Sequence, residues 1–337
     1  MTHVLIVGAG LAGCTIANEL AANNIHVSLV DTAGQIGGKV RSYGCKATDV
    51  CNKCGLCLVS GLWEKVESPS ANIDILLSTK LIDLIQEGES YTAVLKNAAG
   101  NIVIEEINHV VVAAGFDTAD SGFVEYAASP AVINGSQLEK LLRERTGGGF
   151  LETAPESAAF IQCYGSRDRH EHSMYCSRVC CAYTTRAAKV IKHHYPACRV
   201  VFFYMEMQTV EPGEYYQSLL DAGIEFIKCR PVKVSTGETD GRAKVLITYD
   251  EPASGKRFCD SFDLLVLSDG IKPNHQAGQL AEKCGLAQDE AGFLRHVNAA
   301  MPGVLLAGCA AGPKKIEETY KESLSLAKSL VASLDKS

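Results

Sequence analysis

Short apolar runs and a helical repeat alternate along the first thirty residues of the chain. Residues 3–7 form a continuous apolar run, and a second run extends from Ile25 to Val30. Runs of this kind predict strands that are buried on both faces. Between them, apolar residues recur at helical spacing from Cys14 to Ala22. The pattern therefore predicts a strand, a helix and a second, parallel strand.

The turn between the first strand and the helix is rich in glycine, and the second strand ends in an acid, Asp31. Gly8 permits a tight turn, Gly10 lets backbone N–H groups approach a pyrophosphate, and Gly13 lets helix and strand pack closely. An acid at this position can accept hydrogen bonds from the hydroxyls of an adenosine ribose. A tight turn in some other parallel sheet would not require the acid. We therefore expect a dinucleotide site that includes Gly8, Ala9, Gly10, Leu11, Ala12, Gly13 and Asp31.

A double glycine, Gly37-Gly38, follows a few residues after Asp31 and allows close backbone approach to a ligand. This feature is common in flavoproteins with two dinucleotide-binding domains and usually missing from nicotinamide-only proteins, so FAD is the expected cofactor. Lys39 would then place a positive charge near the flavin and favour its anionic reduced form. The alternative is that Lys39 is simply solvated.

Three later segments are predicted to return to the same cofactor. A buried strand from His109 ends in Ala114-Gly115, and another strand runs into Gly308, just before Cys309. Related flavoproteins have an acid at the position of Cys309 that binds the ribityl chain. A final helix follows, and its backbone N–H groups near Lys315 and Ile316 are expected to face the flavin.

The middle of the chain repeats the strand, turn, helix, strand pattern. An apolar strand at 158–163 leads to a turn at 164–168, a helix from about Tyr175 to His194, and a strand at 199–205. The turn has one glycine instead of three, so it is poorly shaped to bind a second pyrophosphate. We therefore predict an α/β protein with two dinucleotide-binding, Rossmann-like domains. Residues 1–145 and 271–337 form the FAD-binding domain, and 146–270, after a flexible join at 146–149, form a degenerate NAD(P)H-like domain.

Composition narrows the functional class. The chain has 337 residues, 47% of them hydrophobic, which is enough for two cores. A net charge of −7 gives no basic footprint for nucleic acid. No apolar run approaches the roughly 20 residues that span a bilayer. A core strand almost at the N-terminus leaves no room for a signal peptide, so the sequence predicts a cytoplasmic location.

Four of the 14 cysteines lie close together, at Cys45, Cys51, Cys54 and Cys57. The last three form the C-x2-C-x2-C run with which bacterial ferredoxins wrap one corner of a cubane, and Cys45 is the nearest fourth ligand. The spacing favours a [4Fe-4S] cluster in an insertion at 44–62. Two alternatives remain: a tetrahedral zinc site, since four thiolates also suit Zn²⁺, and a free dithiol that acts as a disulfide-reductase centre.

A second group, Cys176, Cys180 and Cys181, lies at the expected start of the second helix. Helical spacing would place Cys176 and Cys180 on one face, where the helix N-terminus would lower the pKa of each thiol. Cys163 on the preceding strand is the only other cysteine expected nearby. Structural packing, a redox or partner contact, and metal binding all remain open for this group.

These motifs together resemble the A-subunit family of heterodisulfide reductase, in particular its short form from the heterodisulfide-reductase-like complexes of sulfur-oxidising prokaryotes. The resemblance spans most of the chain. It rests on Gly8 to Gly13, the cysteine run before Trp63, the segment Phe160-Ile161-Gln162-Cys163-Tyr164-Gly165-Ser166-Arg167-Asp168, Tyr175 to Tyr183, and Gly312 to Ile316. The phrase Tyr-Cys-Ser-Arg-Val-Cys-Cys within it is highly specific.

The resemblance implies a thioredoxin-reductase-like flavoprotein with FAD and iron–sulfur centres, usually dimeric. It implies an oxidoreductase subunit that relays electrons between FAD, a [4Fe-4S] cluster on Cys45, Cys51, Cys54 and Cys57, and partner subunits of a heterodisulfide-reductase-like complex in sulfur oxidation. Two other interpretations remain: an NAD(P)H-dependent thiol or disulfide reductase of the thioredoxin-reductase type, and a scaffold with zinc at the cysteines and FAD kept for structure.

Overall fold

The computed structural model describes residues 2–68, 72–119, 129–145, 150–151, 153–169, 173–208, 213–297 and 301–334. The chain forms two compact units, of which unit 1 comprises 1–41, 55–117 and 273–337, and unit 2 comprises 42–54 and 118–272. It passes between them at both ends of the segment 42–54, and again near β8 (Phe116–Thr118) and β17 (Ile271–Pro273). The predicted join at 146–149 lies outside the described residues, and the predicted domain limits stay a prediction.

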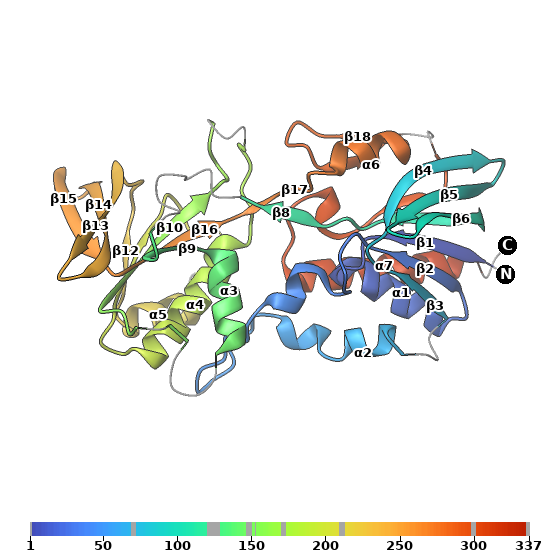
Figure 1. Ribbon diagram of the computed structural model, residues 1–337. Helices are drawn as coiled ribbons and strands as arrows, with labels where there is room; N and C mark the ends of the chain where they lie inside the picture. Colours follow the sequence, from blue (N-terminus) through green and yellow to red (C-terminus); the bar gives the residue numbers. More distant parts are fainter. Residues whose placement is uncertain are drawn as a thin grey trace. The chain divides into compact units, whose positions relative to one another are not determined.

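Unit 1 is built on a five-stranded parallel sheet in the order β20-β7-β1-β2-β3 (Figure 1). Val4 and Ile6 of β1 belong to a core with the helices, whereas Leu5 and Val7 belong to a core with a three-stranded antiparallel sheet, β4-β5-β6. Both faces of β1 are therefore buried, as its continuous apolar run predicts. The strands are β1 (His3–Val7), β2 (His26–Val30), β3 (Ile73–Leu76), β4 (Lys80–Glu87), β5 (Ser90–Asn97), β6 (Gly100–Ile107), β7 (His109–Val112), β18 (Leu286–Gln288), β19 (Leu294–His296) and β20 (Val304–Leu306).

The helices of unit 1 place the glycine turn and the end of the chain close together. α1 (Leu11–Ala22) packs along α7 (Ile316–Leu334), and both cover the face of the sheet that carries Val4 and Ile6. The remaining helices are η1 (Gly38–Ser42), η2 (Leu56–Val59), α2 (Leu62–Val66), α6 (Ala277–Lys283) and η3 (Gly308–Ala311).

Unit 2 repeats this layer scheme with a second parallel sheet, β12-β11-β10-β16-β9 (Figure 1). Phe160 and Phe202 pack with helices on one face, and Ala159 and Val201 pack with the antiparallel sheet β13-β14-β15 on the other. The predicted α/β class with two Rossmann-like sheets is confirmed. The elements are β9 (Val132–Asn134), α3 (Gly135–Glu144), β10 (Ser157–Tyr164), α4 (Cys180–His194), β11 (Arg199–Phe203), α5 (Glu214–Asp221), β12 (Ile224–Ile227), β13 (Lys233–Thr239), β14 (Arg242–Glu251), β15 (Lys256–Phe262) and β16 (Leu264–Asp269).

The prediction for the start of the second helix is wrong. α4 begins at Cys180, five residues later than predicted, so Cys176 and Cys180 do not share a helical face. The physical reason is visible at Arg178, whose φ of 61° is left-handed and incompatible with helix. Cys176 therefore lies in an irregular segment that precedes the helix.

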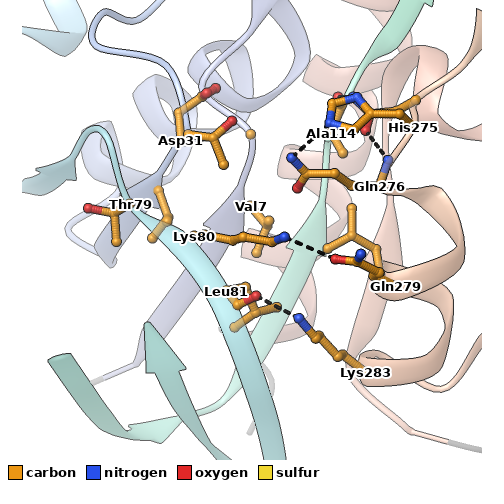
Figure 2. A pocket seen from close by; sticks show the side chains of 15 residues that line it. Val7, Asp31, Thr79, Lys80, Leu81, Ala114, His275, Gln276, Gln279 and Lys283 are labelled. Carbon is orange, nitrogen blue, oxygen red and sulfur yellow. Dashed lines mark hydrogen bonds between the residues drawn. The ribbon is translucent and has the colours of Figure 1, made fainter. Parts of the chain in front are cut away.

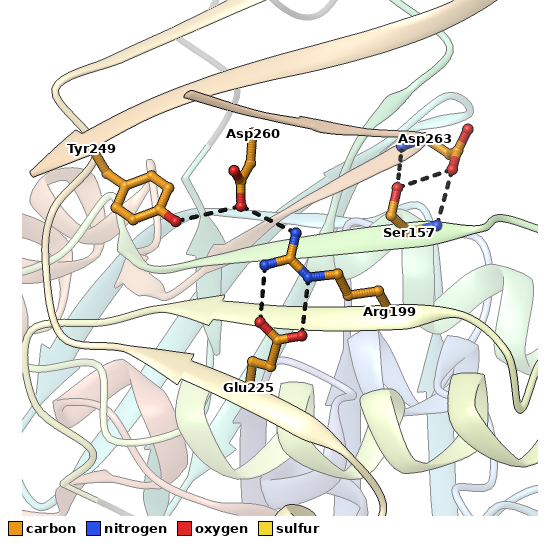
Figure 3. Close-up of polar contacts among 6 residues, drawn as sticks. All are labelled: Ser157, Arg199, Glu225, Tyr249, Asp260 and Asp263. Atoms are coloured by element: carbon orange, nitrogen blue, oxygen red, sulfur yellow. Dashed lines mark hydrogen bonds and ion pairs between the residues drawn. The ribbon is translucent and has the colours of Figure 1, made fainter. Parts of the chain in front are cut away.

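The half-buried carboxylate of Asp263, the residue before β16, is hydrogen-bonded to Ser157 at the start of β10 (Figure 3). Asp263 Oδ2 accepts hydrogen bonds from the Ser157 backbone N–H at 2.9 Å and the Ser157 hydroxyl at 3.0 Å, and Oδ1 accepts from Lys244 Nζ at 2.5 Å. Burial opposes ionisation of this carboxyl, but the Lys244 ammonium and the Ser157 donors outweigh it and lower the pKa of Asp263. The ionised form therefore stabilises unit 2.

We expect Asp263→Asn to lower the free energy of unfolding by about 1–3 kcal/mol at neutral pH, because the Ser157 and Lys244 donors lose a charged acceptor. Since the folded-state pKa of Asp263 lies below its unfolded value of about 3.9, the stability is present above that pH and is lost as the pH falls through the folded-state value. Urea unfolding at pH 7 and pH 3 checks this, and the difference in unfolding free energy between the two proteins should be smaller at the lower pH. Asp250→Asn, at an exposed ion pair with Arg257, is the control and should change little.

Candidate functional site

The glycine turn between β1 and α1 has the shape of a dinucleotide cradle. Gly8 has a φ of +114°, and a Cβ there would overlap the carbonyl oxygen of Ala113. A Cβ at Gly13 would overlap the carbonyl oxygen of Gly8. Gly10 differs, because its φ of −77° is ordinary and nothing lies within 4 Å of the position a Cβ would take. Open space therefore adjoins Gly10 where α1 presents its unpaired N–H groups.

The acid at the end of β2 holds this turn. Asp31 Oδ2 accepts a hydrogen bond from the Ala9 backbone N–H at 2.6 Å, and Oδ1 accepts one from the Ala33 N–H at 2.8 Å. The carboxylate thus fixes the middle of the glycine turn and the start of the following loop. In dinucleotide-binding domains, a carboxylate after this strand accepts hydrogen bonds from the ribose, so Asp31 stays the predicted ribose ligand.

The double glycine packs directly against the cradle. The Gly37 N–H donates to the Ala9 carbonyl at 2.7 Å, and a Cβ at Gly38 would lie 3.0 Å from the Cα of Gly10. Lys39 is exposed, and its Nζ lies 5.6 Å from the centroid of the Phe116 ring. The predicted flavin-tuning lysine therefore lies over the ring that directly follows Ala114-Gly115.

The other predicted cofactor residues also belong to unit 1. The Ala114 carbonyl accepts a hydrogen bond from Asn274 Nδ2 at 3.0 Å, and Gly115 has a φ of +71° with open space at its Cβ position. Gly308 packs against Ala12, since a Cβ there would lie 2.8 Å from the Ala12 Cβ. α7 begins at Ile316, and the Lys315 N–H is capped by the Glu318 carboxylate at 2.9 Å. That capping contact occupies one of the N–H groups expected to face the flavin.

A pocket with a mixed polar and apolar lining opens beside Asp31 in unit 1 (Figure 2). The end of β2, the start of β4 and helix α6 line it. Across it, Lys80 Nζ donates to Gln279 Oε1 at 3.0 Å, and Lys283 Nζ donates to the Leu81 carbonyl at 2.9 Å. Sequence reasoning missed these lining residues, because each lies far along the chain from the glycine motif and no local pattern marks it. The pocket extends the cradle in the direction of the predicted ribose site.

The four cysteines predicted to bind a cluster are free thiols. Cys45, Cys51 and Cys57 are exposed and Cys54 is half-buried. Cys45, Cys51 and Cys54 belong to the unit 2 residues 42–54, and Cys57 belongs to η2 of unit 1. Across the described part of the chain, no three or more His, Cys, Asp or Glu side chains are gathered so as to hold a metal ion. The four thiols have the right chemistry and number for a soft metal.

The second cysteine group gathers at the carboxyl end of β10. The Cys180 thiol donates a hydrogen bond to Cys163, and this bond, opposed by burial and helped by Arg167, lowers the pKa of Cys163 to about 6. The same bond raises the pKa of Cys180, and burial raises that of Cys176. The prediction that the helix N-terminus lowers the pKa of Cys176 and Cys180 is wrong, because Cys176 lies outside the helix and both thiols are desolvated. Sequence reasoning expected Cys163 nearby but missed that it is the thiol with the lowered pKa.

No helix among the described residues combines the length and the apolar character needed to cross a membrane.

Comparison with known proteins agrees with this geometry. Residues 6–57 match the family model described as an NAD(P)-binding Rossmann-like domain. Over its whole length the structure resembles thioredoxin reductases. The TM-score is 0.60 at 15% identity for the T. acidophilum enzyme, with 99% of both chains covered. It is 0.62 at 14% identity for the Lactococcus lactis enzyme, with 99% of this chain and 100% of that one covered. The predicted fold class, including its thioredoxin-reductase-like character, is confirmed.

The proteins that are similar in sequence form a narrower functional group than the solved structures do. An iron–sulfur A-subunit of the CoB–CoM heterodisulfide reductase of Methanopyrus kandleri is 33% identical over 240 residues, 66% of this chain and 36% of that protein. The A-subunit of the ferredoxin:CoB–CoM heterodisulfide reductase of Methanosarcina mazei is 34% identical over 233 residues, 63% of this chain and 29% of that protein. A protein of Archaeoglobus profundus described as similar to this A-subunit is 28% identical over 279 residues, 70% of this chain and 39% of that protein. This chain spans about a third of the length of these relatives, and the predicted resemblance to the A-subunit family of heterodisulfide reductase is confirmed.

Proposed function

We propose that this chain is an oxidoreductase subunit that relays electrons between FAD, a [4Fe-4S] cluster and partner subunits of a heterodisulfide-reductase-like complex, in sulfur oxidation. The observation that carries the proposal is the combination of a complete glycine cradle with Asp31 and, later in the same part of the chain, four free thiols, of which Cys51, Cys54 and Cys57 have ferredoxin spacing. The similarity of this chain to its relatives, one of which is an iron–sulfur subunit of heterodisulfide reductase, supports the proposal. A cytoplasmic homodimer remains part of the proposal.

The cradle fits FAD. The open space at Gly10 leaves room for a pyrophosphate at the N-terminus of α1, and Asp31 offers a carboxylate for the ribose. The double glycine at Gly37 and Gly38 adds a backbone surface beside the cradle. FAD supplies the chemistry of accepting two electrons together and releasing them singly. The residues of this chain bind it, orient it and, through Lys39, provide a positive charge near it.

The position of Cys57 supports a short path from flavin to cluster. η2, which carries Cys57, belongs to the same core as Ile316 at the start of α7. A Cβ at Gly55, two residues before Cys57, would lie 3.5 Å from the Ile316 side chain. Ile316 is one of the residues predicted to contact the flavin. Cys57 is therefore only two residues from Gly55, which packs against a residue of the proposed flavin site, Ile316.

The second cysteine group gives an alternative location for the cluster. Cys163, Cys176, Cys180 and Cys181 interact at the carboxyl end of β10, and the guanidinium of Arg167 adds positive charge. Two buried hydroxyls close by, of Ser166 and Ser177, have no hydrogen-bond partner among the described residues. Four thiols with spare donors would suit an anionic centre, so both groups need to be tested.

We expect Cys51→Ala to lose iron and labile sulfide while keeping FAD, because the thiol is one of four ligands and lies outside the cradle. The measurement is iron, sulfide and flavin content after anaerobic purification. Cys259→Ala, at an exposed cysteine on β15, is the matched control and should keep both centres. If iron is retained in Cys51→Ala but lost in Cys180→Ser, the cluster is bound by the second cysteine group instead. If the protein contains zinc and no iron, the result favours a structural scaffold with zinc at the cysteines.

The runner-up function is an NAD(P)H-dependent thiol or disulfide reductase, which requires a nucleotide site in unit 2. In unit 1 the helix begins four residues after β1 ends, at Leu11, whereas in unit 2 α4 begins only at Cys180, well beyond the end of β10 at Tyr164. The segment 165–179 thus stands between β10 and α4, in place of the short glycine turn of unit 1. Bleaching of the flavin by NADPH would favour the reductase, and its failure would favour the relay.

A further inference from the structure

The thiols of the second cysteine group, which comprises Cys163, Cys176, Cys180 and Cys181, are connected and shielded from water. The Cys180 thiol is hydrogen-bonded to the thiols of both Cys163 and Cys181. These three cysteines are buried, and Cys176 is half-buried. In a site with little water, a nearby charge acts more strongly than it would at the surface. The charges placed next to these sulfurs therefore decide how readily the group takes up negative charge.

The backbone around this group adopts conformations that are rare for residues other than glycine. Cys163 has a φ of 62°, Arg167 has a φ of 55° and Arg178 has a φ of 61°. The pairing of β10 with β16 also shifts its register between Ile161 and Tyr164, next to Cys163. Register shifts of this kind re-aim side chains, and left-handed residues cluster at functional sites. The segment is therefore shaped for more than packing.

Two N–H donors reach sulfurs of the group. The Arg178 backbone N–H donates to Cys176 Sγ at 3.3 Å, and Arg167 Nη1 donates to Cys163 Sγ at 4.0 Å. The first donor is a neutral dipole, whereas the second carries a full positive charge. Hydrogen bonds to the sulfurs and the net charge both set the reduction potential of an iron–sulfur centre. Arg167 acts in both ways at once.

The positive charge of Arg167 is only partly neutralised. Arg167 Nη2 lies 3.5 Å from Glu206 Oε2, and the side chain of Glu206 is 61% exposed whereas that of Arg167 is 24% exposed. An ion pair with an exposed partner is weakened by water and salt. Glu206 therefore helps to hold the guanidinium in place and leaves much of its charge to act on Cys163.

We propose that Arg167 sets the reduction potential of an iron–sulfur centre bound by the second cysteine group, because it holds a positive charge against the sulfur of Cys163. The proposal rests on the proposed function and takes the second of its two locations for the cluster. One-electron reduction makes such a centre more negative by one unit and moves no atom, and in the proposed relay the reduced flavin supplies that electron. A positive charge at a ligand sulfur stabilises the reduced form more than the oxidised form. Arg167 therefore raises the midpoint potential of the centre.

The test is a redox titration of the full chain, purified anaerobically with its cluster, in which electron paramagnetic resonance follows the reduced centre. Arg167→Gln should lower the ratio of reduced to oxidised centre about tenfold at a fixed potential, which for one electron is a downward shift of about 59 mV in the midpoint potential. Arg167→Lys keeps a positive charge and should recover most of this shift. Arg257→Gln, at an exposed arginine on β15, is the matched control and should titrate as wild type does.

Glu206→Gln tests the same role with the opposite sign. Without the carboxylate, the charge of Arg167 is less neutralised, so the midpoint potential should rise. The rise should be smaller than the fall in Arg167→Gln, because the exposed carboxylate is already screened by water. This variant decides the question if Arg167→Gln fails to hold iron, since a raised potential supports the role of Arg167 and an unchanged one overturns it.

Three further results would count against the role of Arg167. An unchanged midpoint potential in Arg167→Gln, or equal shifts in Arg167→Gln and Arg167→Lys, would overturn it and leave the electron relay intact. Iron that is kept in Cys180→Ser and lost in Cys51→Ala would do the same, because the centre would then lie at the first four cysteines. A chain that binds no iron at all would overturn the relay and the role of Arg167 together.

Discussion

Gly10→Ala is expected to lose most of its FAD while the protein stays folded. The methyl group would meet no protein atom, since nothing lies within 4 Å of its position, and the φ of −77° suits alanine. It would instead occupy the space through which backbone N–H groups approach the pyrophosphate. Losing one hydrogen bond to a charged group costs about 1.5–3 kcal/mol, which corresponds to a roughly tenfold to hundredfold weaker affinity.

The measurement is FAD content on purification together with the dissociation constant from flavin fluorescence. Gly237→Ala is the matched control, because Gly237 on β13 also has open space at its Cβ position and no left-handed φ. Its unfolding midpoint and flavin content should equal those of wild type. A Gly10→Ala protein that binds FAD with wild-type affinity would show that the nucleotide lies elsewhere.

Gly13→Ala is expected to destabilise unit 1 through a clash within the protein, in contrast to Gly10→Ala. Alanine is the better helix former by about 1 kcal/mol, which alone would stabilise α1. The new Cβ, however, would overlap the carbonyl oxygen of Gly8 and lie 3.2 Å from the Ile6 side chain. Backbone of a buried turn cannot move away as a flexible side chain can. We therefore expect a net loss of about 3 kcal/mol or more, at the upper end of the cost of overpacking.

Urea unfolding monitored by circular dichroism, with and without excess FAD, checks this second expectation. The transition of Gly13→Ala should move to lower urea in both conditions, whereas that of Gly10→Ala should match wild type in the absence of FAD. If Gly13→Ala unfolded at the wild-type midpoint, the close approach of α1 to the turn would not be required for folding.

The elements around the cradle were predictable because their causes are local. A continuous apolar run such as residues 3–7 favours a strand buried on both faces, and a glycine turn that ends at a helix leaves few conformations open. Asp31 was predictable for the same reason, since it ends the adjacent strand. These features depend on neighbours within about thirty residues.

The features that the sequence did not reveal depend on distant partners. The late start of α4 follows from the left-handed Arg178, and arginine gives no sign of such a conformation. The contact between Lys46 and Glu139 joins residues 93 positions apart, and each residue alone resembles an ordinary surface charge. The lowered pKa of Cys163 requires Cys180 and Arg167, which only the fold brings to it.

The membership of residues 42–54 in unit 2 limits how the protein can be dissected. A contiguous fragment that begins at residue 118 would contain Glu139 but not Lys46, so a carboxylate would be buried without its counter-charge. Such a fragment should express poorly, because an unpaired buried charge is strongly destabilising. A cut-down version of unit 2 would need residues 42–54 supplied as a separate peptide or joined by circular permutation.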